Sequence, residues 1–338
     1  MPSVQDIIVL TLLCALLAML SWAAVAVLRP VLIRYRVVDA PNARSSHSAP
    51  KPRGAGLGLL TVALPAWAAS GLMLEAPGGT WTVLVLALAL AAASFVDDVR
   101  GLPALPRFAA QGLAVALGLA AFDAGPVFQG LLPPWLDGLM AGLLWLWFVN
   151  LFNFMDGIDG ITGVETISLG LGLALIAPLA GFPAGQVLPG LVLAAAAAGF
   201  LVWNWAPSKV FLGDVGSVAL GYLLGWLLLL AAAEGQWVAA LILPAYYLAD
   251  ATLTLLARLL RREKIWQAHK QHAYQRAVQR GWSHARTAGW IAAGNGLLIL
   301  CALAAAAGLP WAALASASMV VFAMLWTFRY AASPVRQE

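Results

Sequence analysis

The chain has 338 residues, of which 62% are hydrophobic and only 10% are charged, and its mean hydropathy is +0.86. A chain with so few polar residues cannot cover a globular surface in water, which excludes a soluble protein. The net charge of +4 comes from 19 Lys and Arg against 15 Asp and Glu. In a membrane protein this excess indicates topology, anionic headgroups or an anionic substrate, and we expect no nucleic-acid partner.

The apolar runs indicate many membrane-spanning helices. Crossing the hydrocarbon core takes about 20 helical residues, and about eleven runs approach or exceed that length. The last two are separated only by a Gly-Leu-Pro turn, so ten spans are the alternative. We therefore expect an all-α, polytopic integral membrane protein, with residues 1–338 forming a single transmembrane catalytic domain. The expected spans are 4–28, 54–75, 80–97, 107–122, 136–153, 160–180, 186–205, 215–233, 237–257, 286–307 and 309–328.

Positive charge alternates along the chain. All 19 Lys and Arg residues lie in or beside every second connection between these runs. Basic residues that flank spans are retained in the cytoplasm, so the pattern predicts an external N-terminus and a cytoplasmic C-terminus. The first run is long, lacks a basic leader and ends at Arg29, which indicates a membrane helix rather than a cleaved signal. The predicted cytoplasmic loops lie near 29–53, 98–106, 154–160, 206–214 and 258–285.

Two adjacent acids, Asp97 and Asp98, end the third apolar run at the predicted cytoplasmic surface. Adjacent carboxylates repel each other and lose solvation there unless a cation or a basic side chain offsets them. A divalent metal ion would offset both charges. The alternative is that both acids cap a helix end in water, but the C-terminal end of a helix is electrostatically unfavourable for carboxylates.

The fifth run ends in a polar segment in which Asn153, Asp156 and Asp159 recur at every third residue. On a helix these three side chains would project to one side, within an arc of about 120°. Oxygen donors at this spacing, next to an anionic substrate, suit Mg²⁺. The alternative is a plain turn, because Gly157 and Gly160 loosen the backbone here.

A third acid, Asp214, stands between two glycines in segment 211–217, where the eighth run begins. The residue could be a simple N-cap of the following helix. The same helix start also offers free backbone N–H groups to a phosphate.

The largest predicted cytoplasmic loop, 258–286, contains eight basic residues and a single acid. Two histidines three residues apart, with two cations beside them, could bind a diphosphate. A zinc site is less well supported because the segment has no Cys and no third His at a suitable spacing. The alternative is a solvated amphipathic stretch lying on anionic lipid. The four residues are His269, Lys270, His272 and Arg276.

These motifs share one predicted membrane surface, and the chain from about residue 35 to 285 resembles the polyprenyl-phosphate N-acetylhexosamine-1-phosphate transferases, of glycosyltransferase 4 type. It is most similar to the members that begin O-antigen synthesis. The resemblance rests on Asp39-Ala-Pro-Asn42-Ala-Arg44, His47, Pro50, Pro52-Arg53-Gly54, Asp97-Asp98, Asn153 to Gly160, Phe211 to Ser217 and His269 to Arg276.

The resemblance implies a reaction in which a UDP-N-acetylhexosamine and undecaprenyl phosphate give an undecaprenyl-diphosphate-sugar and UMP. It implies Mg²⁺, with Mn²⁺ as a substitute, and a multi-pass protein of the bacterial inner membrane that acts at the cytoplasmic face, with a homodimer as one assembly. In this family Asp98, Asn153 and Asp214 look like metal-site residues. Asp97 looks like a lipid-phosphate ligand or base.

Further roles are implied in the same way. Asp156 and Asp159 resemble the nucleotide region, and His269 and His272 the diphosphate or sugar side. Together with Asp97 and Asp98 these four are the catalytic candidates. The substrate-binding candidates, including basic residues that we expect to neutralise phosphate charge, are Asn42, Arg44, His47, Arg53, Arg107, Lys270 and Arg276.

Two departures from the family pattern qualify the substrate. The peptidoglycan-type transferases carry three consecutive histidines, whereas this chain has His269-Lys-Gln-His272, which argues against a muramyl-pentapeptide donor. In addition, Gly54-Ala55-Gly56 replaces a tighter glycine pair, with no clear consequence.

Other classes fit the motifs less well. A secondary transporter would place its acids near the bilayer midplane, often in broken helices of repeated halves. A lipid-binding scaffold would not need several acidic motifs facing basic loops. A CDP-alcohol phosphotransferase would concentrate its acids in one Asp-Gly-x-x-Ala-Arg run, which the sequence lacks.

Overall fold

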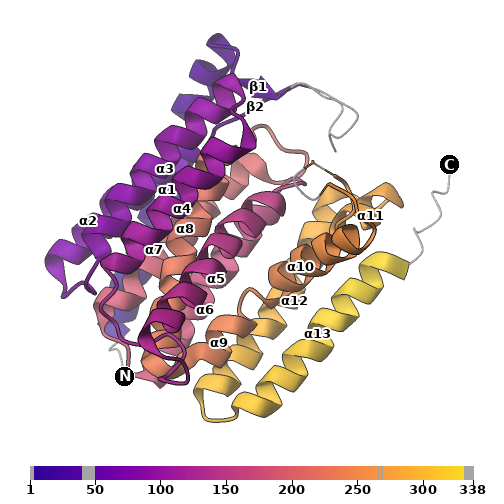
Figure 1. Cartoon of the computed structure of the whole chain (residues 1–338). Helices are drawn as coiled ribbons and strands as arrows, with labels where there is room; N and C mark the ends of the chain where they lie inside the picture. The colour runs from indigo at the N-terminus through magenta and orange to yellow at the C-terminus, as the bar shows by residue number, and fades with distance from the viewer. Residues whose placement is uncertain (1–3, 40–49, 265–266, 268, 331–338) are drawn as a thin grey trace.

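The computed structural model describes residues 4–39, 50–264, 267 and 269–330. These residues form a helical bundle with one short hairpin (Figure 1). The elements are α1 (Val4–Arg34), β1 (Val38–Asp39), β2 (Lys51–Pro52), α2 (Gly56–Met73), α3 (Thr80–Arg100), α4 (Ala104–Ala120), α5 (Pro134–Phe154), α6 (Ile161–Ala180), α7 (Ala184–Asn204), α8 (Asp214–Ala231), η1 (Ala232–Gln236), α9 (Trp237–Ile242), α10 (Ala245–Leu260), α11 (Ala273–Gln279), α12 (His284–Ala306) and α13 (Pro310–Tyr330).

The expected all-helical membrane architecture is confirmed, whereas the count of eleven spans is not. Nine helical runs in the described part of the chain are long and apolar enough to cross a membrane, and α4 is a shorter apolar helix. One of the nine, Asp214–Ile242, merges the predicted eighth span with the start of the ninth. The predicted ninth span is broken before α10 at Pro244, which cannot continue the helical hydrogen bonding.

The chain reverses within that merged run. Glu234 and Gly235 in η1 leave helical geometry, and Gly235 has a φ of 88°, which glycine adopts without strain. The start of α8 is tied to β2, because Phe211 N donates to Pro52 O at 2.8 Å. Helix α10 runs back to α11 at the same end of the bundle (Figure 1). A turn at η1 therefore separates an outgoing helix from a broken returning one.

The hairpin and the start of α8 close the polar end of the bundle. The strands β1 and β2 are antiparallel, with Val38 opposite Pro52. Behind them, α2 and α8 touch backbone to backbone, since a Cβ on Gly56 would lie 2.5 Å from the Cα of Gly216. This close approach requires glycine, and it places Arg53, just before α2, beside the first residue of α8.

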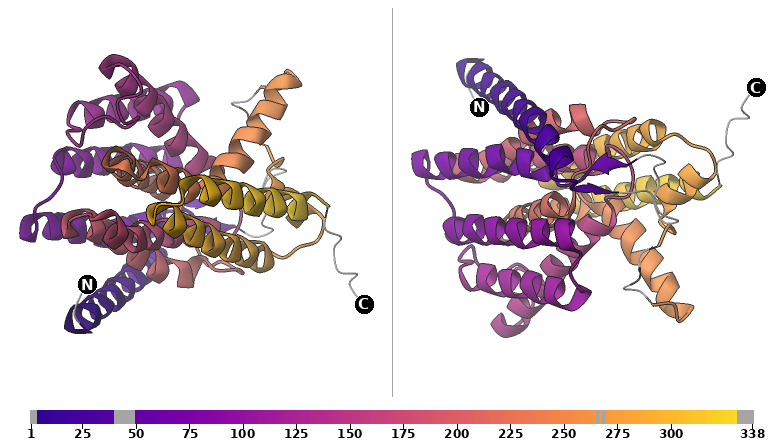
Figure 2. Two further views of the ribbon diagram at one scale, coloured as in Figure 1. Left: turned by 90° about the horizontal axis from the view of Figure 1, so that it is seen from below. Right: turned by 90° about the horizontal axis from the view of Figure 1, so that it is seen from above.

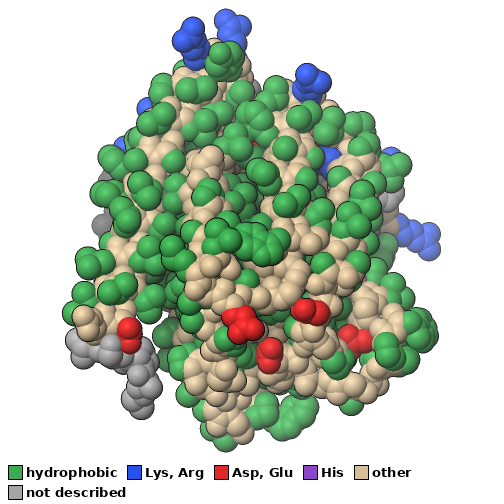
Figure 3. All heavy atoms as spheres, turned by 90° about the vertical axis from the view of Figure 1, so that its left-hand side faces the viewer, with side chains coloured by type: hydrophobic (Ala, Val, Ile, Leu, Met, Phe, Trp, Pro, Cys, Tyr) green, Lys and Arg blue, Asp and Glu red, His purple; other side chains and the backbone are tan. Residues whose placement is uncertain are grey.

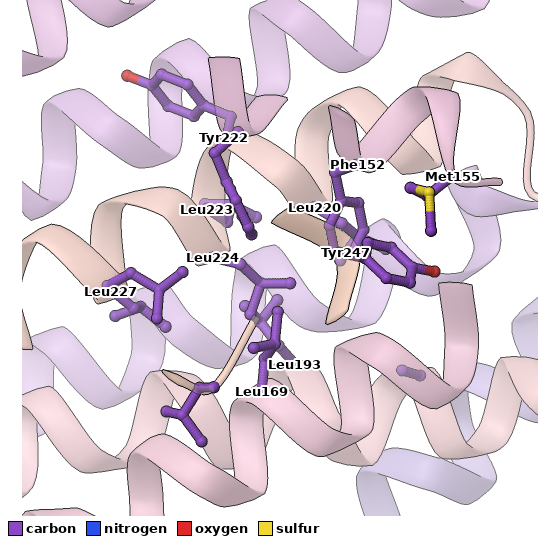
Figure 4. Close-up of a cluster of buried hydrophobic side chains, with 14 of the residues drawn as sticks. Phe152, Met155, Leu169, Leu193, Leu220, Tyr222, Leu223, Leu224, Leu227 and Tyr247 are labelled. Atoms are coloured by element: carbon purple, nitrogen blue, oxygen red, sulfur yellow. The ribbon is translucent and has the colours of Figure 1, made fainter. Parts of the chain in front are cut away.

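Helix α8 is the centre of the core. All residues after its first one are buried, as expected for a helix that is apolar all round. Figure 4 shows its leucines packed against side chains of the surrounding helices. The residues in contact there include Phe152 of α5, Leu169 of α6, Leu193 of α7, Leu220, Leu223, Leu224 and Leu227 of α8, and Tyr247 of α10.

The outside of the bundle suits a lipid environment. Helices α1 and α10 lean away from the other helices (Figure 2), and α10 exposes apolar side chains such as Leu253 and Leu260. One face shows a broad apolar belt with Lys and Arg at the end of the β hairpin and Asp and Glu toward the opposite end (Figure 3). This separation of charge is typical of a protein oriented by the positive-inside rule.

Candidate active site

The polar end holds three carboxylates and two guanidinium groups that we call the carboxylate–arginine cluster: Asp97, Asp98, Asp214, Arg53 and Arg107. Arg53 lies 2.7 Å from Asp98 through Nε and 2.8 Å from Asp214 through Nη2. Arg107 Nη1 lies 2.7 Å from Asp97 and 3.1 Å from Asp214. Asp214 thus joins the two arginines, and five residues predicted from four separate segments meet in one place.

Asp98 links two helices within this cluster. Its carboxylate lies at the unfavourable C-terminal end of α3 but accepts hydrogen bonds from the first backbone N–H groups of α8, at Asp214 N and Val215 N, both at 3.0 Å. A negative charge is favoured at that position. The carboxylates of Asp98 and Asp214 also hold the pKa of Arg53 above its ordinary value, although burial opposes this. With its side chain fully enclosed, Asp98 orients Arg53 and the start of α8.

Asp97 occupies the outer side of the cluster. Its Oδ1 accepts from Leu102 N just beyond α3, and its Oδ2 accepts from Arg107 Nη1. The Arg107 side chain is 40% exposed, so this cation is the member of the cluster most open to an incoming ligand. Asp97 therefore fixes both the connection between α3 and α4 and the side chain of Arg107 in the first turn of α4.

A second group, the Asp159 cluster, consists of Asp159, Lys51, Ser208 and His284. Ser208 donates to Asp159 through its hydroxyl at 2.8 Å and its backbone N–H at 3.0 Å. Lys51 Nζ lies 3.5 Å and His284 Nδ1 3.4 Å from Asp159 Oδ2. Burial alone would raise the pKa of Asp159, but the adjacent imidazole of His284 and the hydrogen bonds from Ser208 hold it well below its usual range. The carboxylate is charged and joins four chain segments.

Asp156 lies between the two clusters, in a loop rather than on a helix. Helix α5 ends at Phe154, so the predicted helical arc of Asn153, Asp156 and Asp159 is wrong, and only Asn153 is helical. Thr162 donates to Asp156 Oδ1 at 2.6 Å, while burial raises the pKa of Asp156 to about 6. The pKa of Asp156 is thus raised, whereas the pKa of Asp159 is lowered.

The histidine segment is fixed by an acid of α10. Asp250 is 1% exposed and accepts from Ala273 N at 2.8 Å at the start of α11. It also lies 3.6 Å from Nδ1 of His272, which precedes α11. Burial, with a contribution from His272, lowers the pKa of His269 to about 4, and its Nδ1 accepts from Gln271 N at 3.3 Å. His269 is therefore neutral near pH 7, with its proton on Nε2.

The remaining substrate-binding candidates are less closely assembled. Burial and nearby Arg329, Arg261 and Arg280 lower the pKa of Arg276, which lies among other arginines rather than in the carboxylate–arginine cluster. The backbone carbonyl of Lys270 accepts from Gln279. Asn42, Arg44 and His47 lie outside the described residues.

Sequence reasoning missed four residues that organise the site: Lys51, Ser208, Asp250 and His284. For Asp250 a signal existed, because it is an acid inside a predicted span, where ionisable residues are costly and usually functional. The others are single polar residues in segments far apart in sequence, and no spacing rule connects them.

The carboxylate–arginine cluster suits Mg²⁺. Within the described residues no group of three or more His, Cys, Asp or Glu side chains is arranged to hold a metal ion. Mg²⁺ does not need such a cage, since it commonly takes one or two carboxylates and completes its shell with phosphate oxygens and water. Arg107 already brings one cationic nitrogen between Asp97 and Asp214, which shows that these two carboxylates can share a positive charge. They fit the ion better than Asp98, whose oxygens are all engaged.

Comparisons with known proteins show the family of this chain. The model of Glycosyl transferase family 4 matches residues 80–232, which include Asp97, Asp98 and Asp214. A Bacillus subtilis (strain 168) protein, named probable undecaprenyl-phosphate N-acetylglucosaminyl 1-phosphate transferase, is 30% identical over 276 residues, or 76% of this chain and 74% of the relative.

Two further relatives have related names. The decaprenyl-phosphate N-acetylglucosaminephosphotransferase of Mycolicibacterium smegmatis is 30% identical over 80% of this chain and 75% of its own length. The phospho-N-acetylmuramoyl-pentapeptide-transferase of Moorella thermoacetica is 36% identical, but over only 30% of this chain and 31% of its own length. Because the match to the Bacillus protein spans most of both chains, this protein belongs to the polyprenyl-phosphate N-acetylhexosamine-1-phosphate transferases.

Proposed function

We propose that this sugar-phosphate transferase uses undecaprenyl phosphate as acceptor and a UDP-N-acetylhexosamine as donor, and that it starts an O-antigen or related cell-surface glycan. An oxygen of the lipid phosphate attacks the phosphorus that carries the sugar. A new P–O bond forms, the bond to the bridging oxygen breaks, and UMP leaves. The carboxylate–arginine cluster carries this proposal, because it gathers two cations for the phosphate groups of the two substrates.

In this reaction the protein mainly positions and neutralises charge. A phosphate monoester with a second pKa of about 6 is largely dianionic near neutral pH, so the attacking oxygen scarcely needs a general base. Arg53 and Arg107 bind the phosphates, and Asp97, Asp98 and Asp214 hold the arginines in place. When bound, Mg²⁺ would offset the charge on the diphosphate.

Two other groups complete the site. We assign the Asp156–Asp159 loop to the nucleotide part of the donor, next to the cationic Lys51. Neutral His269, whose Nδ1 accepts from Gln271 N, presents an Nε2–H donor to the diphosphate or the sugar.

An apolar cavity of about 410 Å³ gives the polyprenyl chain a place to bind. It is lined by residues of α5, α8, α9 and α10, including Trp147, Leu228, Leu241 and Leu248, and almost none of its lining is polar. The acceptor phosphate must reach the polar end of the bundle while its chain stays in hydrocarbon. A groove between α5 and the broken α9–α10 pair offers the chain apolar surroundings within the membrane part of the bundle.

Filling this groove should selectively weaken acceptor binding. We expect Leu241→Trp to raise the KM for undecaprenyl phosphate several-fold and to leave the KM for the UDP-sugar unchanged, because only the lipid would lose space. Leu253→Trp is the matched control, since Leu253 is 50% exposed on α10 and does not line the cavity. Equal acceptor KM values for both variants would refute this assignment of the groove.

We further propose that the protein crosses the bacterial inner membrane eleven times, with α4 and the α9–α10 pair each counted as one crossing. The N-terminus would then be external, and the polar end with the site cytoplasmic. The alternation of basic residues supports this orientation. A C-terminal fusion to green fluorescent protein should fluoresce in cells. A dark fusion, together with an active alkaline phosphatase fused at the same point, would contradict this topology. A homodimer is a prediction from the resemblance, to be checked by native mass spectrometry.

The decisive assay measures UMP release. Purified protein in nanodiscs is mixed with undecaprenyl phosphate, Mg²⁺ and a panel of UDP-linked GlcNAc, FucNAc, QuiNAc and MurNAc-pentapeptide. We expect release with one of the first three, loss of release with a chelator, and recovery with Mg²⁺ or Mn²⁺. Turnover of the MurNAc-pentapeptide alone would indicate the peptidoglycan-type reaction, which the partial match to the Moorella protein makes the second candidate. No release with any donor would refute the proposed function.

A further inference from the structure

A buried acid lies within the membrane part of the bundle, beyond the loop of Asp156 and Asp159. Glu165 belongs to α6, where its side chain is 0% exposed. Its Oε2 accepts a 2.7 Å hydrogen bond from Nδ2 of Asn295 on α12, which is 1% exposed. Neither residue takes part in the proposed reaction. A charged carboxylate at this depth is energetically costly, and ionisable residues inside membrane spans are usually functional.

The unpaired atoms of this pair indicate the form in which Glu165 is held. Oε1 of Glu165 and Oδ1 of Asn295 are both buried without a hydrogen-bond partner. No basic side chain of the described residues is paired with Glu165, and a carboxylate buried without a counter-charge is strongly unfavourable. An uncharged acid has a proton to donate to Asn295 Oδ1. Acid and amide then satisfy each other.

This pair adjoins the side chains that hold Asp156. Thr162 lies one turn before Glu165 on the same face of α6, and its hydroxyl donates to Asp156 Oδ1. From α10, the ring of Tyr247 (Figure 4) is fully buried, and its hydroxyl lacks a hydrogen-bond partner. That hydroxyl lies close to Glu165 and Asp156. A buried polar path therefore connects the pair to the loop.

The partner helix reaches the other half of the same loop. Helix α12 begins at His284, whose Nδ1 accepts from Asp159 N at 3.3 Å and lies near the Asp159 carboxylate. Helix α6 begins directly after the loop, at Ile161. The Glu165–Asn295 bond thus joins α6, which follows the loop in the chain, to α12, whose first residue contacts the loop.

We propose that Glu165 is a positioning residue that acts as an uncharged acid: paired with Asn295, it locks α6 against α12 and so fixes the Asp156–Asp159 loop for binding of the donor. This inference rests on the proposed function, in which the loop binds the nucleotide part of the UDP-sugar. It predicts that the charge of Glu165 is dispensable and that its hydrogen bonding is not.

Three variants test the proposal. Glu165→Gln keeps an uncharged, hydrogen-bonding side chain, so kcat and both KM values should stay within about twofold of wild type. Glu165→Leu leaves Asn295 without a partner, and we expect a lower Tm and a donor KM raised about tenfold. The double variant Glu165→Leu, Asn295→Leu removes the unpaired amide and should recover Tm while the donor KM stays high.

The acceptor KM should not change in any of these variants. Ser168→Ala is the matched control, because Ser168 lies on the same helix and bonds only to Val164 O of its own backbone. Loss of turnover in Glu165→Gln would show that the charge or the proton is required and would overturn the proposal. A wild-type donor KM in the double variant would do so as well, since the pair would then serve stability alone.

A readout independent of turnover separates this proposal from the proposed function. The infrared carbonyl band of an uncharged carboxylic acid should be present in wild type near neutral pH and reduced in Glu165→Gln, and an unchanged band would overturn the inference. If wild type transfers none of the UDP-sugars, the proposed function fails, while this band and the order of Tm values still decide whether Glu165 is an uncharged, paired acid.

Discussion

Replacing Asp214 with Asn should lower kcat for UMP release by about 10²–10³-fold, the range expected when a preorganised charge partner is removed from an active site. Asp214 alone contacts both arginines of the carboxylate–arginine cluster. The cluster holds three carboxylates against two guanidinium groups, and its excess negative charge attracts a divalent cation. Asn removes that excess and presents an amide N–H to one of the arginines. The variant therefore loses both the excess negative charge of the cluster and the carboxylate that orients Arg53 and Arg107.

The helix bundle should survive this change, because Asp214 stands at the start of α8 and Asn keeps its size and one oxygen acceptor. We expect the Tm to stay close to that of wild type, and raised Mg²⁺ should not restore turnover. Asp123→Asn is the matched control, since this exposed acid lies at the opposite end of the bundle and should leave kcat unchanged. Normal turnover by Asp214→Asn would remove the cluster from the mechanism.

The members of the carboxylate–arginine cluster could be predicted because each breaks an apolar pattern. Asp97, Asp98 and Asp214 stand at the ends of long apolar runs, where a charge needs a partner. Arg53 and Arg107 follow from the same alternation of basic residues that predicts the topology. What could not be predicted is the pairing, such as the hydrogen bonds by which Asp98 joins α3 to α8.

The Asp159 cluster shows the opposite case. Asp159 was found through its motif, but Lys51, Ser208 and His284 come from three distant segments and form no local pattern. Only the packing of β2, α12 and the connection between α7 and α8 against the loop brings them to the carboxylate. The effect of Ser208 and His284 on the pKa of Asp159 nevertheless outweighs that of burial.

Errors in the expected elements have local causes. The spacing predicts a helix from Asn153 to Asp159, yet α5 ends at Phe154, shortly before Gly157, a residue with low helix propensity. The apolar pattern predicts a continuous ninth span, but Pro244 lies in its middle and breaks it. The hairpin of β1 and β2 was not anticipated, because strands of two residues carry no periodic pattern.

The two acids of the loop should respond to neutralisation with opposite changes in stability. For Asp156 the folded-state pKa of about 6 lies above the ordinary value of 3.8. Ionisation therefore costs the folded protein about 3 kcal/mol, a penalty that is absent below about pH 4 and complete above about pH 6. Asp156→Asn removes this penalty and keeps an oxygen acceptor for Thr162. Its Tm should rise at about pH 8 and match wild type at about pH 4.

For Asp159 the sign is reversed. Its pKa is depressed in the folded state, so its charge stabilises the protein above the unfolded value of about 4, and this stability is lost only as the pH falls through the lower folded value. Asp159→Asn should therefore lower the Tm at about pH 8. Thermal unfolding of both variants in detergent with a chelator checks the prediction. Tm changes of equal sign would contradict it.

Function should fall in both variants, whatever the change in Tm. Each acid belongs to the loop assigned to the donor, so we expect a higher KM for the UDP-sugar with both Asp156→Asn and Asp159→Asn. An Asp156→Asn protein that is more stable and less active would show that the loop keeps an unfavourable buried charge for binding. A stability gain without any loss of donor affinity would instead place Asp156 outside the nucleotide site, and the loop would then act on the donor through Asp159 alone.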